Sequence, residues 1–261
     1  MSGSKQHKQH WRGLLPAIAL AVAPLVAPAA PVAAVAHADG LVLTPESTPF
    51  GKTYGQWSAA WWQWALSIPV HSPPFSSHIN HPLFDLTGAQ CGEGQTGPVW
   101  FLGGAFFITG AAAQTSIVRK NCIVPSSKAL YFPLINAECS LLEGPTFGCG
   151  GTGVTDLRAD IKPFIDGATG RVSAEVDSVA IPISTRFREQ SPAFSFTLPP
   201  DDLLSAIGEG AFRPGTYFPS VDDGYYLMLA PLSAGAHKIH FVGASTVGPF
   251  FLEVTYEVTV K

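Results

Sequence analysis

Residues 251–260 read Phe-Leu-Glu-Val-Thr-Tyr-Glu-Val-Thr-Val, and they give the clearest indication of the architecture. From Leu252 onward, apolar and polar side chains alternate along this segment without interruption. Successive side chains of a β-strand point to opposite faces, so the pattern predicts a strand with one face against a core and the other in water.

Seven further segments carry strand signals, because each is apolar or alternating and is bounded by Gly, Pro or Asp. They are residues 99–108, 116–124, 130–135, 172–181, 194–198, 225–229 and 237–242. Helices do not alternate regularly with these segments, which favours a mainly β fold over a βαβ fold. The expected architecture is an antiparallel, jelly-roll-like β-sandwich. Pro133 predicts an edge position for its strand, and residues 232–236 are predicted to be a hairpin connection.

A tryptophan-rich helix is predicted near the N-terminus of the folded part, over residues 53–69. Thr53 and Gln56 form a capping box, and Pro69 ends the segment. Within it Trp57, Trp61 and Trp64 recur at helical spacing and predict a buried face, whereas Trp62 lies off that stripe.

Two shorter helical segments are predicted among the strands. Residues 154–166 carry apolar side chains at helical spacing, and residues 203–207 follow a Pro-Pro-Asp-Asp start. No linker rich in Pro, Gly or Ser divides the chain after the leader, so we expect a single domain over residues 39–261.

Residues 1–38 have the three zones of a secretory signal peptide. A basic start through Arg12 precedes an Ala-, Leu- and Val-rich stretch, and the segment ends in Ala36-His37-Ala38. Four prolines interrupt the apolar stretch, which argues against a membrane anchor. We therefore expect cleavage after Ala38, no membrane span in the mature chain, and a secreted or periplasmic protein.

Composition and charge narrow the classes of function. The chain is 46% hydrophobic and 13% charged, which excludes a disordered tail. Three of its 15 basic residues and none of its 19 acidic residues lie in the leader. The mature chain therefore has 12 basic and 19 acidic residues, which give a net charge of −7. Nucleic acid is therefore excluded as an expected partner.

The four cysteines predict two disulfides in an oxidising compartment. We favour Cys91 with Cys122 and Cys139 with Cys149, because these partners are near in sequence and the second pair encloses a Gly-rich loop. Spacing leaves the other pairings open.

His71, His78 and His81 share one Pro-rich loop and are candidate metal ligands. Imidazole suits zinc, copper or iron. The alternative is that these histidines bond backbone carbonyls left unpaired around the prolines. No cofactor is specified by this pattern.

Glu138, Asp222 and Asp223 are the candidate catalytic carboxylates, since a pair of carboxyl groups could act as acid and base on a glycosidic bond. Glu138 ends an apolar run, where partial burial would raise its pKa. The alternatives are a structural carboxylate at Glu138 and a turn at Asp222-Asp223-Gly224.

Trp62 and Tyr225 are the candidate ligand contacts. Exposed aromatic faces stack on sugar rings or on other apolar ligands. The alternative for the tryptophans is core packing, which we expect for the stripe but not for Trp62.

Four segments resemble a group of uncharacterised exported bacterial proteins: residues 53–69, 97–102, 136–139 and 224–226. The likeness extends over nearly all of the mature chain and implies no activity.

The sequence therefore favours an exported, non-catalytic protein that binds an extracellular small molecule or polysaccharide. We expect this ligand to be a glycan or an amphiphile. Two alternatives stay open. One is a secreted hydrolase or lyase that acts on an extracellular polymer, and the other is a structural or surface-interaction protein.

Overall fold

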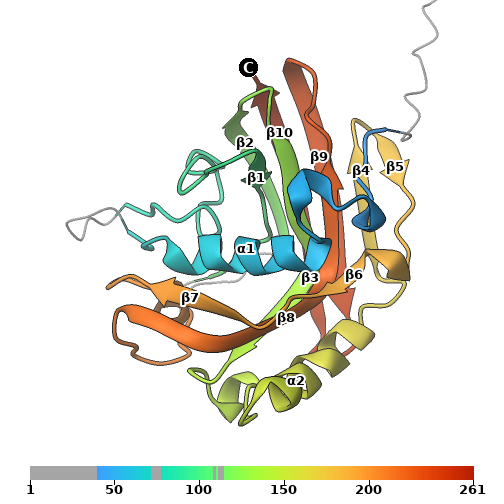
Figure 1. The fold of residues 1–261 in the computed structure, drawn as a ribbon. Helices are drawn as coiled ribbons and strands as arrows, with labels where there is room; N and C mark the ends of the chain where they lie inside the picture. Colours follow the sequence, from blue (N-terminus) through green and yellow to red (C-terminus); the bar gives the residue numbers. More distant parts are fainter. Residues whose placement is uncertain (1–39, 72–77, 108–109, 111–114) are drawn as a thin grey trace, which may run out of the picture. The chain divides into compact units, whose positions relative to one another are not determined.

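The described chain is built mainly from β-strands arranged in two five-stranded sheets, as the sequence predicts (Figure 1). The computed structural model describes residues 40–71, 78–107, 110 and 115–261. The described residues belong to one compact unit. The predicted signal peptide lies outside the described residues.

The first sheet has the strand order β1-β3-β8-β6, and β7 also pairs with β8. Its strands are β1 (Val99–Phe101), β3 (Ala129–Ser140), β6 (Arg188–Gln190), β7 (Phe194–Leu198) and β8 (Gly215–Leu229). The pairings are antiparallel except that of β1 with β3, which is parallel.

The second sheet has the order β2-β10-β9-β4-β5. Its strands are β2 (Ser116–Val124), β4 (Val172–Val176), β5 (Val179–Ile181), β9 (Gly235–Ser245) and β10 (Phe250–Val260). In β10, Tyr256, Val258 and Val260 are buried while Glu257 and Thr259 are exposed, so the predicted alternation is confirmed over residues 256–260. Thr255, on the predicted polar face, is buried. Because β1 pairs with β3 and β2 pairs with β10 in parallel, both sheets are mixed. The predicted antiparallel arrangement holds for the other strand pairs of the described chain.

Two connections differ from the prediction. Residues 172–181 form a hairpin of β4 and β5, because Asp177 and Ser178 both adopt positive φ (51° and 67°), as a type I′ turn requires. The segment 232–236 joins β8 of the first sheet to β9 of the second, so it crosses between sheets and is not a hairpin connection.

Pro133 does not lie on an edge strand, since β3 sits between β1 and β8. The short strand β1 pairs with Ala129–Tyr131 and ends before it reaches Pro133. A missing backbone N–H is therefore tolerated at this point of an interior strand.

The helices are α1 (Tyr54–Ser67), α2 (Val154–Asp166) and α3 (Leu203–Ala206). Within the described ranges, four 3₁₀ turns accompany them: Pro45–Ser47, Pro49–Gly51, Pro145–Phe147 and Thr185–Phe187. The predicted capping box is present at the start of α1, where the Thr53 side chain accepts from the Gln56 amide and the Gln56 side chain accepts from the Thr53 amide.

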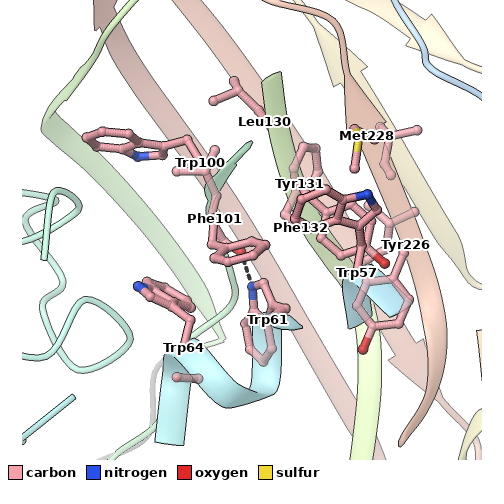
Figure 2. Packing of buried hydrophobic residues seen from close by; sticks show 14 of the residues in the cluster. Trp57, Trp61, Trp64, Trp100, Phe101, Leu130, Tyr131, Phe132, Tyr226 and Met228 are labelled. Atoms are coloured by element: carbon pink, nitrogen blue, oxygen red, sulfur yellow. Dashed lines mark hydrogen bonds between the residues drawn. The ribbon is translucent and has the colours of Figure 1, made fainter. Parts of the chain in front are cut away.

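The core gathers around the tryptophan face of α1. Figure 2 shows Trp57, Trp61 and Trp64 projecting from the helix toward the region of Phe101 and Tyr131. The indole of Trp61 donates to the carbonyl of Leu102 (2.7 Å). The expected burial of the stripe is confirmed, because all three tryptophans are less than 7% exposed.

Both disulfides form with the predicted partners. Cys91 bonds Cys122, and Cys139 bonds Cys149, with Cα atoms 5.5 and 5.4 Å apart. Among the described residues no helix is long and apolar enough to cross a membrane.

Candidate functional site

An irregularity in the pairing of β3 with β8 determines which side chains meet beneath α1. The register shifts between Pro133 and Ile135, so that Pro133 pairs with Tyr226 and Asn136 pairs with Gly224. Residues paired across two strands share a face. The shift therefore places Asn136 and Glu138 on the same face of the sheet as Asp222 and Tyr226.

A cavity of about 170 Å³ opens beside this irregularity, and we call it the bulge cavity. Residues from α1, β3, α2, β10, the segment between α1 and β1 and the segment after β1 line it. They are Trp61, Leu83, Gly104, Ala105, Phe106, Pro133, Leu134, Ile135, Asn136, Phe164, Phe250 and Leu252. The lining is mainly aromatic and aliphatic, which is typical of a small-molecule site.

A chain of hydrogen bonds leads from the cavity into the protein. The amide nitrogen of Asn136 donates to the Tyr226 hydroxyl (3.1 Å), which donates to Oδ1 of Asp222 (2.7 Å). The indole of Trp62 donates to the same oxygen (2.7 Å). One side chain of the cavity is thus held by a network of buried groups.

Asp222 lies at the centre of this network. Its side chain is fully buried, and Oδ2 has no hydrogen-bond partner within the described part of the chain. Burial raises the pKa of Asp222 to about 7, although the hydrogen bonds from Tyr226 and Trp62 act in the opposite direction. The carboxyl group therefore titrates near neutral pH.

The two predicted ligand contacts are buried. Trp62 is 5% exposed and packs against Phe106, with ring centroids 6.3 Å apart, so it lies behind the wall of the bulge cavity. Tyr225 is 2% exposed, and its hydroxyl lies 3.3 Å from that of Thr169. The prediction that Trp62 reaches a cleft is wrong, because its indole nitrogen is turned inward to Asp222.

Of the three candidate catalytic carboxylates, Glu138 has the raised pKa that its sequence position predicted. Burial is the main cause, and the nearby charge of Glu143 adds to it. Glu138 accepts from the hydroxyl of Ser220, and its side chain is 8% exposed. Neither Glu138 nor Asp222 lines the bulge cavity.

Asp223 faces the opposite side of β8 from Asp222, as neighbours on a strand do. Arg188 holds it through two hydrogen bonds, of 2.9 and 2.7 Å, and also bonds Asp166 on α2. This contact gives Asp223 a structural role. The alternative of a turn at Asp222-Asp223-Gly224 is wrong, because these residues lie within β8.

Sequence reasoning missed a cluster of three glutamates. Glu143 lies beside Glu138 and accepts from both the backbone amide and the hydroxyl of Ser140 (2.6 and 2.8 Å). Burial and the neighbouring Glu143 raise the pKa of Glu209 to about 9. No spacing pattern joins Glu209 to the other two, since it comes from the segment after α3.

The candidate metal ligands have protein partners instead. His81 is fully buried, its Nε2 donates to the carbonyl of Ala65 (2.8 Å), and its Nδ1 accepts from the Leu83 amide (3.1 Å). Burial lowers the pKa of His81 to about 4, so it stays neutral. His71 bonds Asp201.

Both ring nitrogens of His81 are therefore occupied, which overturns the prediction of a metal held by His71, His78 and His81. Across the described ranges, no group of three or more His, Cys, Asp or Glu side chains could hold a metal ion. The alternative of a backbone-bonded loop histidine applies to His81.

No protein-family model, curated protein or solved structure matches this chain. The resemblance to exported bacterial proteins remains a prediction, and the candidate function rests on the geometry of the site.

Proposed function

We propose that this is an exported protein that binds a small, mainly apolar or amphiphilic extracellular ligand in the bulge cavity. The observation that carries the proposal is the cavity itself, since aromatic and aliphatic side chains surround it and one carboxamide lies in its lining.

The size of the cavity limits the ligand. Apolar cavities of about 150 Å³ admit benzene, so a space of about 170 Å³ suits one ring or a short alkyl chain. A polysaccharide would instead need an extended surface with exposed aromatic faces, and Trp62 and Tyr225 are buried. The amphiphile is thus the better-supported of the two ligand classes.

Export is supported by the two disulfides, which persist in oxidising compartments. The three-zone pattern of residues 1–38 adds to this support. Mass spectrometry of the protein from its native source tests it directly. We expect a mature N-terminus at Asp39 and no free thiols, and an intact Met1 with four thiols would contradict export.

The hydrolase or lyase alternative has weaker support. Glu138 is occupied by Ser220 and Glu143, and Asp223 by Arg188, so the carboxylates already have protein partners. A non-catalytic binding role needs none of them to be free.

The binding proposal can be tested by titrating the protein with p-cresol and following its resonances by NMR. We expect saturable binding at one site, with shifts of residues around the cavity. Ala105 lines the cavity, so Ala105→Leu would fill it and abolish binding. Ala236 is exposed on β9, and Ala236→Leu is the matched control that keeps wild-type affinity.

Two results would contradict this proposal. One is that neither p-cresol nor a short alkanol binds, which would favour the structural or surface-interaction alternative. The other is that binding survives Ala105→Leu unchanged, which would place the ligand elsewhere. Binding of N-acetylglucosamine in preference to p-cresol would restore the glycan hypothesis.

A further inference from the structure

The carboxamide of Asn136 differs from the other side chains that line the bulge cavity. Among the described residues that line the cavity, only Trp61 besides Asn136 contributes a polar side-chain atom, and its indole N–H already donates to Leu102. Asn136 is therefore the side chain that can exchange a hydrogen bond with a bound molecule.

The hydrogen-bond network fixes which end of this carboxamide is available. A tyrosine hydroxyl has one hydrogen, and that of Tyr226 is directed at the carboxylate of Asp222. Toward Asn136 the hydroxyl must accept, so the NH₂ end of the carboxamide faces Tyr226. The oxygen end takes no part in these hydrogen bonds, and it is the acceptor that the carboxamide can offer to a ligand.

The anchor of this network is rigid. Trp62 and Tyr226 both donate to one oxygen of a carboxyl group that is fully buried. At the base of Asn136, Gly224 lies so close that an added Cβ atom would be 2.6 Å from the Asn136 Cβ. The carboxamide is thus held from both its tip and its base.

We infer that Asn136 is a specificity-determining residue of the bulge cavity, and that its amide oxygen selects ligands that donate a hydrogen bond. This inference rests on the proposed function, because it concerns the same cavity. The ligand class is then a small apolar body with a hydroxyl or N–H group, such as an alcohol, a phenol or an indole. Ethers and ketones of the same size are disfavoured.

A matched pair of ligands tests this inference, because cyclohexanol and cyclohexanone differ little in size but only the alcohol donates. The titrations should be done at pH 8.5, where Asp222 is ionised, with dissociation constants measured by NMR. We expect wild-type protein to prefer the alcohol by about threefold to tenfold, the fold-change that one hydrogen bond supplies.

Two variants locate the origin of that preference. Asn136→Leu removes the acceptor at similar volume, so the preference should disappear while cyclohexanone still binds. Tyr226→Phe leaves the carboxamide in place but frees it to rotate, so the preference should shrink. Asn121 is exposed on β2, and Asn121→Leu is the control that keeps the wild-type ratio.

The outcomes separate this inference from the proposed function. Equal affinities for the two ligands in wild-type protein, or a preference that persists in Asn136→Leu, would overturn the role of Asn136 while binding itself remains. If neither ligand nor p-cresol binds the wild-type protein, the proposed function fails and the inference fails with it. If Asn136→Leu does not fold, the Tyr226→Phe variant provides the test once circular dichroism has shown that it is folded. An unchanged preference for cyclohexanol over cyclohexanone in Tyr226→Phe then contradicts the inference.

Discussion

The indole nitrogen of Trp62 donates a 2.7 Å hydrogen bond to Oδ1 of Asp222, a residue 160 positions further along the chain. This contact ties α1 to β8 of the first sheet, where Asp222 pairs with Glu138 of β3. Trp62 lies off the apolar stripe, yet it is buried in the hydrophobic core against Trp61 and Phe106. Its indole N–H is paired there with a buried carboxyl group.

Replacing Trp62 by Phe should destabilise the protein by about 1–3 kcal/mol, because it removes one donor to a buried carboxylate. Urea unfolding at pH 8.5 measures this change. A double-mutant cycle with Asp222→Ala, which removes the acceptor oxygen, isolates the contact from the loss of packing. Additive effects of the two substitutions would show that the hydrogen bond contributes nothing beyond burial of the ring.

The glutamate cluster should make the protein less stable as pH rises. Burial raises the pKa of Glu138, Glu143 and Glu209 in the folded state. The ordinary pKa of a glutamate is 4.5, and the pKa of Glu209 in the folded protein is about 9. Between these two pH values the folded state holds a proton that the unfolded chain has released. The free energy of unfolding therefore falls across this range as pH increases.

The variant Glu209→Gln should flatten this dependence and raise Tm at pH 9, since it removes a charge that burial disfavours. Each kcal/mol gained corresponds to about 2–4 °C in Tm for a domain of this size. Glu257 is exposed on β10, so Glu257→Gln is the control that leaves the profile unchanged. Thermal unfolding by circular dichroism at several pH values measures both. A stability profile that rises with pH between 5 and 9 would contradict the role of the cluster.

Arg188 should be important for stability because it neutralises Asp223, whose side chain is fully buried. Arg188→Ala leaves that charge unpaired and should cost about 3 kcal/mol in chemical denaturation. Asp166→Asn breaks the other ion pair of Arg188 and should cost far less, because Asp166 is exposed to water. Equal losses in the two variants would mean that burial of Asp223 is not what makes the contact important.

The two disulfides should differ in their contribution to stability. They close loops with sequence separations of 31 and 10 residues. The chain-entropy relation then gives about 3.7 kcal/mol for Cys91–Cys122 and about 2.7 kcal/mol for Cys139–Cys149. Double alanine variants of each pair, compared by guanidinium unfolding, measure the difference. A larger loss for the shorter loop would show that local packing, not loop closure, determines the order.

Much of the fold could be predicted because its signals are local. The segments 116–124, 154–166 and 194–198 coincide with the strands and helix that form there. The capping box at Thr53 and both disulfides also form as expected. Each of these features depends on spacing or residue type within a short stretch.

The site could be predicted only in part. Glu138 was identified as a carboxyl group with a raised pKa, since it ends an apolar run, and this is confirmed. The cleft position predicted for Trp62 is wrong, and for His81 the structure confirms the backbone-bonded alternative and not the metal ligand. Helical periodicity and loop position do not reveal which buried group a side chain will bond. Asn136 could not be distinguished as a cavity residue, since the residues around the cavity come from several elements.

By itself, the sequence determined the mainly β class and the tryptophan-rich helix, because alternation, helical period and capping act between neighbours in the chain. It favoured the cysteine pairing that forms but left the other pairings open. Only the tertiary structure decided that Asn136, Tyr226, Asp222 and Trp62 form one network. Asn136 and Tyr226 are 90 residues apart in the chain, and Trp62 and Asp222 are 160 residues apart. The shift of register at Pro133 places Asn136 on the same sheet face as Tyr226 and Asp222, because displacement by one residue in a strand turns a side chain to the opposite face.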